Sequence, residues 1–360
     1  MTRRIAAIVG VAIAFGVTAV VAVAIWPERA GEGGGSTSTT DAAALTASAP
    51  GADGIRGDSG RLPAVTVPPD ITRTIAISHF ALLPVTGPLP VHHRFKHPPV
   101  AGILFDVRSG AVLWERNPRL EHPVASLTKM MTALIVANRN RPTEHVRVSR
   151  KAAQTPGSAT GLLPRGRKVP LEPLLQALIM ISANDAAVAL AEHDGGTVTR
   201  FVKAMNRQAE SMGLQCTHYS TPNGLRDRNN YSCPRDLAAL ARADLANRRI
   251  AQIAQTRYAK PRFPIKGKHL YLFNNHYFLQ RGLPGLPQAQ VTGLKTGFTD
   301  PAGRCYVTTA RVGNRQLGVV LIHSPDPITQ VPALLRAGFE EEGVVAPAPV
   351  PVKRKPPPGG

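Results

Sequence analysis

Short runs of apolar, β-favouring residues lie near both ends of the central part of the chain. Two runs on the N-terminal side are separated by the turn-forming tripeptide Arg108-Ser109-Gly110, and they predict a β-hairpin over residues 100–107 and 111–115. Three runs on the C-terminal side are separated by Asp, Pro, Gly and Asn residues typical of turns. They predict a meander of strands at residues 291–297, 305–312 and 317–323.

The middle of the chain has helical periodicity. Apolar residues recur three and four positions apart over segments long enough for helices, which are expected at 124–138, 171–181, 186–193, 198–212 and 234–246, with a further helix at 328–342. Strands at both ends with helices between them predict an α+β fold, in which the N- and C-terminal strands share one antiparallel sheet. This domain is expected to cover residues 99–342.

The first 27 residues determine the expected compartment. Arg3 and Arg4 precede an uncharged run of 22 residues, from Ile5 to Trp26. At about 1.5 Å per residue this run spans roughly 33 Å, enough for a bilayer core, with its positive end in the cytoplasm. We expect an uncleaved membrane anchor followed by an exported chain. The alternative is a signal peptide cleaved near the small residues Ala22-Val23-Ala24, which would leave the domain secreted.

Two further segments lack the pattern of a folded domain. Residues 28–98 are rich in Gly, Ser, Thr and Pro, with too little apolar surface to offset the entropy of ordering, and are expected to be a flexible linker and an extended lead-in. Residues 343–360 form a Pro-rich, basic tail. His92, His93 and His97 in the lead-in are interpreted as a solvated loop, because no second set of metal ligands lies nearby.

The charge of the chain changes the picture little. Lys and Arg outnumber Asp and Glu by 43 to 23, which gives a net charge of +20. The excess is spread as single Arg residues among apolar ones, and only 5% of residues are aromatic. Lys/Arg runs with interleaved aromatic residues, typical of a nucleic-acid surface, are not part of this pattern. We therefore predict no nucleic-acid partner.

Candidate chemistry begins at Ser126-Leu127-Thr128-Lys129. Ser126 and Lys129 are three positions apart at the start of a predicted helix, so they share one face, and free backbone N-H groups there can hold an oxyanion. Lys129 is followed by an apolar run, which indicates either a desolvated lysine with a lowered pKa or a lysine that reaches the surface. The spacing alone is weak evidence for a nucleophile and its base.

Two more elements complete the set of candidates. Ser182-Ala183-Asn184 lies where one apolar helix ends and another begins, a position at which Ser and Asn also serve simply as helix caps. Lys295-Thr296-Gly297 ends a predicted strand, where an ammonium, a hydroxyl and a glycine can hold a substrate carboxylate.

The three elements in this order resemble the active-site-serine penicillin-recognising enzymes. Their flanks, ASLTKMMTALIVA, LLQALIMISANDAAVALAEHDGG, YSTPNGL and GLKTGFTDPAGRC, are similar to those of the serine-type D-alanyl-D-alanine carboxypeptidases, the low-molecular-mass penicillin-binding proteins of peptidase family S11. The resemblance covers about residues 99–323. It implies a β-lactamase/transpeptidase-like fold.

The resemblance also implies catalytic roles. Ser126 would attack the carbonyl of the penultimate D-Ala of a peptidoglycan stem peptide, and Lys129 would accept its proton. The backbone N-H groups of Ser126 and Phe298 would form the oxyanion hole. Ser182 would relay a proton to the leaving amine.

Substrate binding is implied by the same resemblance. Asn184 would bind the peptide amide, while Lys295 and Thr296, with Gly297 permitting close approach, would hold the terminal carboxylate. No metal or organic cofactor is needed, and β-lactam antibiotics would be inhibitors.

Other activities of the same superfamily stay open. A transpeptidase or endopeptidase would pass the acyl group to, or take it from, another peptide, and a catalytically silent wall-binding module would use the basic surface alone. No Glu-x-x-Leu-Asn stretch lies between Asn184 and Lys295, which disfavours a class A β-lactamase.

Three cysteines remain to be placed in the exported domain. Cys216 and Cys233 enclose a loop of 16 residues, and a disulfide between them would constrain it. Cys305, in an apolar strand, is expected to stay a buried thiol. The alternative is that all three are reduced core residues.

Overall fold

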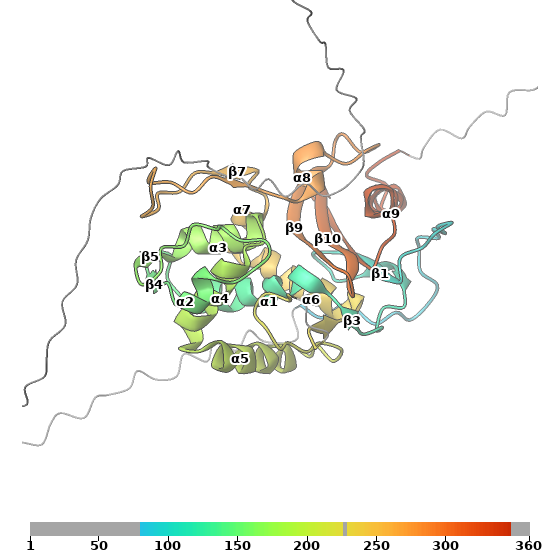
Figure 1. Ribbon diagram of the computed structural model, residues 1–360. Helices are drawn as coiled ribbons and strands as arrows, with labels where there is room; N and C mark the ends of the chain where they lie inside the picture. Colours follow the sequence, from blue (N-terminus) through green and yellow to red (C-terminus); the bar gives the residue numbers. More distant parts are fainter. Residues whose placement is uncertain (1–79, 226–228, 347–360) are drawn as a thin grey trace, which may run out of the picture. The chain divides into compact units, whose positions relative to one another are not determined.

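A computed structural model describes residues 80–225 and 229–346 (Figure 1). Its centre is a five-stranded antiparallel sheet with the strand order β2-β1-β11-β10-β9. These strands are β1 (Ala101–Asp106), β2 (Val112–Arg116), β9 (Gln290–Thr299), β10 (Gly303–Val312) and β11 (Arg315–Ile322). The N-terminal hairpin joins the C-terminal meander where β1 pairs with β11. The predicted α+β arrangement is therefore confirmed.

One face of the sheet is covered by the helical region. Alternation along β1 directs Ile103 and Phe105 into the larger of two core clusters, which the helices of this region complete. The helices are α1 (Lys129–Arg139), α3 (Leu171–Met180), α4 (Asn184–Gly195), α5 (Val198–Ser211), α6 (Pro234–Ala246) and α7 (Arg248–Ala254). Helix α1 packs against α3, α4, α5 and α6, so it lies at the centre of this layer.

The opposite face of the sheet is covered by α8 (Tyr277–Arg281) and α9 (Pro327–Glu341). Leu104 of β1 and Val319 of β11 point to this side and pack with Leu334 and Phe339 of α9. The domain thus has three layers, with the sheet between two sets of helices (Figure 1).

Small elements connect these layers. They are the 3₁₀ helix η2 (Ala125–Thr128), helix α2 (Arg150–Ala153), and the strand pairs β3 (His122–Pro123) with β6 (Tyr231–Ser232), β4 (His145–Arg147) with β5 (Lys168–Pro170), and β7 (Tyr258–Ala259) with β8 (Leu272–Phe273). The predicted helix at 124–138 differs most, because its first turn is 3₁₀ and only Lys129–Arg139 is α-helical.

Residues 80–98 contain no helix or strand, yet they pack against the domain. Leu82 and Val91 are buried in the two core clusters. The guanidinium of Arg242 donates to the carbonyl oxygens of Phe80, Ala81, Val107 and Arg108, at 2.5 to 3.1 Å. The predicted N-terminal anchor, the predicted linker up to residue 79 and the predicted C-terminal tail from residue 347 onward lie outside the described residues. Within 80–225 and 229–346, no helix is long and apolar enough to cross a membrane.

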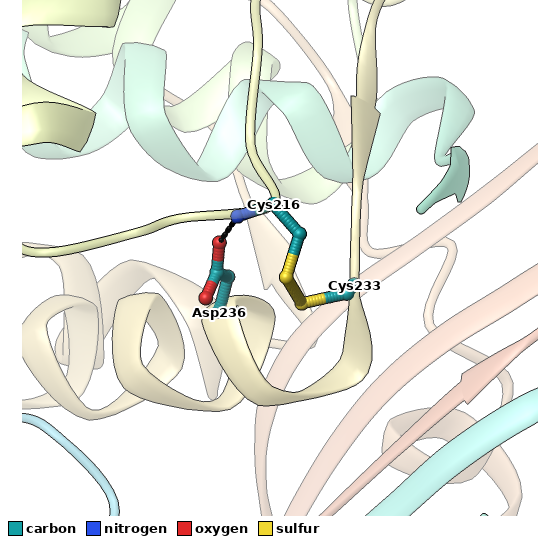
Figure 2. A group of neighbouring side chains, drawn as sticks. All are labelled: Cys216, Cys233 and Asp236. Atoms are coloured by element: carbon teal, nitrogen blue, oxygen red, sulfur yellow. Dashed lines mark hydrogen bonds between the residues drawn. A yellow bond between two sulfur atoms is a disulfide. The ribbon is translucent and has the colours of Figure 1, made fainter. Parts of the chain in front are cut away.

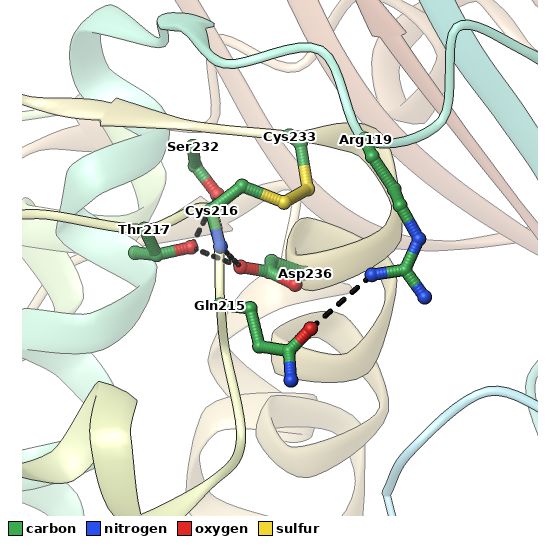
Figure 3. The surroundings of a disulfide bond; sticks show 7 residues. All are labelled: Arg119, Gln215, Cys216, Thr217, Ser232, Cys233 and Asp236. Atoms are coloured by element: carbon green, nitrogen blue, oxygen red, sulfur yellow. Dashed lines mark hydrogen bonds between the residues drawn. A yellow bond between two sulfur atoms is a disulfide. The ribbon is translucent and has the colours of Figure 1, made fainter.

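Cys216 and Cys233 form a disulfide, which is one of the two alternatives that the sequence left open (Figure 2). Cys305 is a buried thiol. The bridge lies against Asp236 of α6, whose carboxylate accepts from the Cys216 N-H at 2.8 Å and from the Thr217 hydroxyl at 2.7 Å. Figure 3 shows these contacts at the base of the loop between the two cysteines. Because the sulfur atoms are bonded to each other, they are not thiolate ligands for a metal.

The three histidines of the lead-in lie apart from this group. His92 and His97 are exposed, and the His93 ring packs on Phe95 with 4.4 Å between ring centroids.

Candidate functional site

Ser126 lies in the 3₁₀ turn that leads into α1. The turn is fixed by its neighbours: Ala125 and Leu127 are buried, while Ser126 between them is half-buried. Ala125 has φ 48°, in the left-handed region that side chains other than Gly rarely adopt. This strained position turns the chain directly before Ser126 and presents its hydroxyl at the start of α1.

Lys129 is the first residue of α1, and its ammonium group is held inside the protein. Its Nζ donates to Ser126 Oγ at 2.9 Å and to the carbonyl oxygen of Asn223 at 2.8 Å. Only 1% of the residue is exposed. Burial lowers the pKa of Lys129 well below its ordinary value, and the charge of Lys295 lowers it further, while Asp185 opposes the shift. Lys129 therefore contacts Ser126, and its lowered pKa favours the neutral amine that a base requires.

Two glycines let other segments approach the turn at Ser126. A Cβ at Gly297 of β9 would lie 2.9 Å from the Ser126 backbone nitrogen. A Cβ at Gly224, whose φ is 72°, would overlap the carbonyl group of Ala125. The strand end and the loop that supplies the Asn223 carbonyl therefore both press against the turn, which only glycine permits.

Ser182 lies in the turn between α3 and α4. It has φ 60° and is 4% exposed, and its Oγ has no hydrogen-bond partner among the described residues. A buried hydroxyl without a partner is uncommon and is often found at a functional position. The helix after it begins at Asn184 with Ala183 as the N-cap residue and no capping side chain, so the alternative that Ser182 and Asn184 serve as helix caps is wrong.

Asn184 and Asp185 hold the loop at residues 156–161 against the start of α4. Asn184 Nδ2 donates to the Pro156 carbonyl at 2.9 Å. The Asp185 carboxylate accepts from the Thr160 hydroxyl at 2.6 Å and from the Thr160 and Gly161 backbone N-H groups. This clamp places a carboxylate close enough to Lys129 to act on its pKa.

Lys295 of β9 is the second buried lysine. It is 3% exposed, and its Nζ donates to the Thr296 carbonyl at 2.8 Å. Burial lowers the pKa of Lys295 to about 7. Beyond it the strand emerges from the core, since Thr296 and Gly297 are half-buried and Phe298 is 63% exposed. Exposure therefore increases along this end of β9, from the buried side chain of Lys295 to the exposed ring of Phe298.

His276 lies beneath this edge and carries no signal in the sequence. Its Nε2 is 3.4 Å from the Val307 carbonyl and 3.3 Å from Thr308 Oγ1, and Val307 is the β10 partner of Lys295. Burial, assisted by the charge of Lys295, lowers the pKa of His276 to about 4. The ring is therefore neutral at pH 7 and adds no charge beside Lys295.

Sequence reasoning also missed the carbonyl of Asn223 and the carboxylate of Asp185. Asn223 acts through its backbone, which no residue type reveals. Asp185 lies at a predicted helix start, where an acidic residue usually serves as a cap, so its residue type alone does not indicate an effect on Lys129.

Residues 93–325 match the peptidase S11 family, which is described as D-alanyl-D-alanine carboxypeptidase. The chain belongs to this family. The D-alanyl-D-alanine carboxypeptidase DacA of Haemophilus influenzae is 34% identical over 229 residues, which are 61% of this chain and 56% of the relative. A D-alanyl-D-alanine endopeptidase of Escherichia coli is 31% identical over 225 residues, which are 62% of this chain and 70% of the relative.

The fold agrees with the family. A crystal structure of a D-alanyl-D-alanine carboxypeptidase from Mycobacterium tuberculosis H37Rv superposes with a TM-score of 0.63 at 30% identity, covering 71% of this chain and 96% of that one. The chain spans 56% of the length of the Haemophilus relative, so the match covers only part of that protein.

Proposed function

We propose that the chain is a serine D-Ala-D-Ala carboxypeptidase, which removes the terminal D-Ala from peptidoglycan stem peptides. The contact between Lys129 Nζ and Ser126 Oγ, in a buried site that lowers the pKa of the lysine, is the observation that carries the proposal. Family membership supports the same substrate class.

The reaction begins with attack on the penultimate carbonyl carbon. Lys129, neutral, takes the proton of the Ser126 hydroxyl as the oxygen bonds to that carbon. The backbone N-H groups of Ser126 and Phe298 donate to the developing oxyanion. The bond to the leaving nitrogen then breaks, and the proton on Lys129 passes through the Ser182 hydroxyl to the amine of free D-Ala.

Deacylation returns the enzyme to its first state. A water molecule gives a proton to Lys129 and attacks the carbonyl carbon of the ester. The bond from that carbon to Ser126 Oγ then breaks, and Ser126 takes the proton back from Lys129. The hydrogen bond from Lys129 to the Asn223 carbonyl supports the role of its amine as a base held in position. The Ser182 hydroxyl, which has no hydrogen-bond partner among the described residues, supports its role in passing on a proton.

Binding uses the other candidates. With Nδ2 held by Pro156, the Oδ1 atom of Asn184 accepts the peptide N-H of the substrate. Lys295 and the Thr296 hydroxyl hold the terminal carboxylate, and Gly297 allows the substrate backbone to lie along β9.

We further propose an extracytoplasmic location, with the uncharged run at residues 5–26 as a membrane anchor. The disulfide between Cys216 and Cys233 supports an oxidising compartment, because such bonds do not persist in the cytosol. The substrate class supports the same location, since the wall lies outside the membrane.

The proposal is tested by acylation and by product analysis. The full chain exposed to penicillin is expected to carry an adduct on the peptide containing Ser126, and a pentapeptide ending in D-Ala-D-Ala is expected to yield a tetrapeptide and D-Ala. Replacing Lys129→Met should slow acylation by about 10² to 10⁴. An adduct that persists in Ser126→Ala, or wild-type protein without any adduct, would reject the assignment.

The same incubation separates the related activities. A cross-linked dimer of stem peptides is cleaved by an endopeptidase, and an added amine acceptor is incorporated by a transpeptidase. A carboxypeptidase releases D-Ala with water as the acceptor and leaves the cross-link intact.

A further inference from the structure

The segment around β7 and β8, here called the arm and defined as residues 257–277, has a composition unlike the rest of the chain. No Asp or Glu occurs between Asp244 and Asp300. The arm has the sequence RYAKPRFPIKGKHLYLFNNHY, in which five Lys or Arg residues are interspersed with aromatic ones. The prediction from the whole sequence, that basic and aromatic residues are not interleaved in this chain, is therefore wrong for the arm.

Strand geometry turns the aromatic residues outward. Along β8 the side chains alternate, so that Leu270 and Leu272 are buried while Tyr271 and Phe273 are 57% and 65% exposed. Polar residues usually occupy the solvent side of such a strand, and here aromatic rings take their place. Tyr258 of β7, the ladder partner of Phe273, is 44% exposed.

These rings form one surface. The ring centroids of Tyr258 and Phe273 are 4.8 Å apart, and the ammonium of Lys260 lies 5.1 Å from the centroid of Tyr271. The rings of Tyr258 and Phe273 thus lie on the outer face of β7 and β8 together with Tyr271, whose ring is covered by Lys260. This combination is typical of binding surfaces. We call this surface, made by Tyr258, Lys260, Tyr271 and Phe273, the platform.

A basic hollow adjoins the platform. It has a volume of about 510 Å³ and lies between the arm and the β4–β5 pair. Lys168, Arg262 and Lys268 line it together with His145 and His269, and no acidic side chain does. A ligand that contacts both features therefore offers flat apolar faces and negative charges.

The arm is continuous with the walls of the proposed active site. The backbone N-H of Asn275 donates to the Met180 carbonyl at 2.8 Å, two residues before Ser182. His276 contacts Val307, the strand partner of Lys295. A substrate that extends beyond its reacting end has the arm as the next surface along this side of the site.

We infer that the arm is a subsite for the glycan strand that carries the stem peptide, an inference that rests on the proposed function. The axial C-H groups of an N-acetylhexosamine ring form a weakly positive apolar face, which the negative face of an aromatic ring attracts. The platform takes these sugar rings. The basic hollow takes the carboxylates of stem peptides on the same strand.

The observations favour a glycan over a bilayer or a nucleic acid. A bilayer binds an apolar tip that inserts, whereas the exposed rings of the platform lie on the flat side of a two-stranded ribbon. At the tip of this ribbon Phe263 is buried, and the exposed residues are Lys266, Gly267 and Lys268. The contacts between the arm and the walls of the proposed active site favour the glycan over a nucleic acid, because the glycan is attached to the substrate of that site.

The test compares two substrates that share one reacting end. One is the free pentapeptide, and the other is the same peptide attached to glycan oligomers. Full-length protein with Tyr271→Ala and Phe273→Ala together is compared with Leu120→Ala, an exposed apolar residue off the arm. We expect kcat/KM on the glycan-linked substrate to fall about tenfold in the double variant, at about two- to tenfold per ring, with no change on the free peptide or in Leu120→Ala.

Binding is also measured without catalysis. Full-length protein is sedimented with insoluble peptidoglycan, and a neutral N-acetylglucosamine hexamer is expected to release wild-type protein but to matter little for the double variant. This readout stands even if no peptide is cleaved, so failure of the subsite and failure of the proposed function are distinguishable. Equal losses on both substrates, or unchanged activity on the glycan-linked one, overturn the inference. So does platform-dependent binding to phosphatidylglycerol vesicles or single-stranded oligonucleotide that exceeds binding to peptidoglycan.

Discussion

Raising the pH through the pKa of Lys295 should remove the preference of the enzyme for substrates with a free terminal carboxylate. In the proposed function the ammonium of Lys295 holds that carboxylate. Burial lowers the pKa of Lys295 to about 7, against an ordinary value of 10.5. The charge that the clamp needs is therefore lost close to neutrality, far below the pH at which an exposed lysine would lose it.

The size of the effect follows from two limits. Above pH 7 the charged fraction falls about tenfold per unit, so about one molecule in a hundred keeps it at pH 9. The loss cannot exceed the worth of the charge-assisted hydrogen bond, about 1.5 to 3 kcal/mol, or roughly ten- to a hundredfold. We expect kcat/KM for a carboxylate substrate to fall by this factor between pH 6 and 9 and then to level off.

The contribution of Lys295 to the free energy of unfolding rises with pH, while kcat/KM falls. The loss of activity is therefore distinguishable from a loss of fold. The unfolded chain binds a proton on Lys295 up to about pH 10.5, whereas the folded chain releases it at about 7. Between these values the unfolded state holds more protons, so this residue makes the fold more stable as the pH rises. An alkaline loss of activity with a constant or rising free energy of unfolding is the expected pair of results.

The assay measures kcat/KM from pH 5.5 to 9.5 on two peptides, one ending in a carboxylate and one in an amide. Kcat/KM reports the free enzyme, in which no substrate charge has yet raised the pKa of Lys295. The amide peptide should show no alkaline fall from this residue. Lys295→Arg keeps its charge and should shift the fall to higher pH, and Lys295→Met, which has none, should treat both peptides alike.

An equal alkaline fall of kcat/KM on the two peptides in the wild type would show that Lys295 does not hold the terminal carboxylate. In that case Lys295 would act by positioning Lys129 and Ser182 and would not contact the carboxylate. Additive losses from amidation and from Lys295→Met would lead to the same rejection, since two changes that remove one contact are not additive.

Two further predictions concern the loops around Ser126. Replacing Cys216 and Cys233 by Ser should lower the free energy of unfolding by about 3 kcal/mol, because the bridge closes a loop of 16 residues. Urea titration measures this free energy, and an unchanged unfolding midpoint would contradict the prediction. Gly224→Ala should destabilise the fold by about 1 to 3 kcal/mol and slow penicillin acylation, since its Cβ overlaps the Ala125 carbonyl. Gly313→Ala, which has φ 57° and nothing within 4 Å, is the control for backbone strain alone, and equal effects of the two variants would reject the overlap.

The sequence predicted the elements whose pattern is local and long. Helix α6 was expected at 234–246 and occupies Pro234–Ala246, and the five strands of the main sheet lie within two residues of their expected limits. Periodicity reports which face of an element is buried, and these elements are buried strongly. The joining of N- and C-terminal strands in one antiparallel sheet was also predicted, because terminal hairpins in an α+β chain are commonly joined in this way.

The elements that were missed are held by distant contacts and not by local pattern. The strand pair β7 and β8 has two residues in each strand, and its outward residues are aromatic, so no alternation of apolar and polar residues marks it. The 3₁₀ turn at Ser126 looked like the first turn of a helix. Its geometry depends on the approach of Gly224 and Gly297, which are far away in the sequence.

The state of Lys129 shows why a motif alone does not determine chemistry. An exposed lysine with a pKa of 10.5 is neutral in about three molecules in ten thousand at pH 7, too few for an effective base. Burial on α1 raises that fraction, and the charge of Lys295 raises it further. Helix α1 and strand β9 must therefore fold together before Lys129 has the lowered pKa that a base needs. For this reason the Ser126-to-Lys129 spacing is weak evidence by itself and strong evidence once β9 is in place.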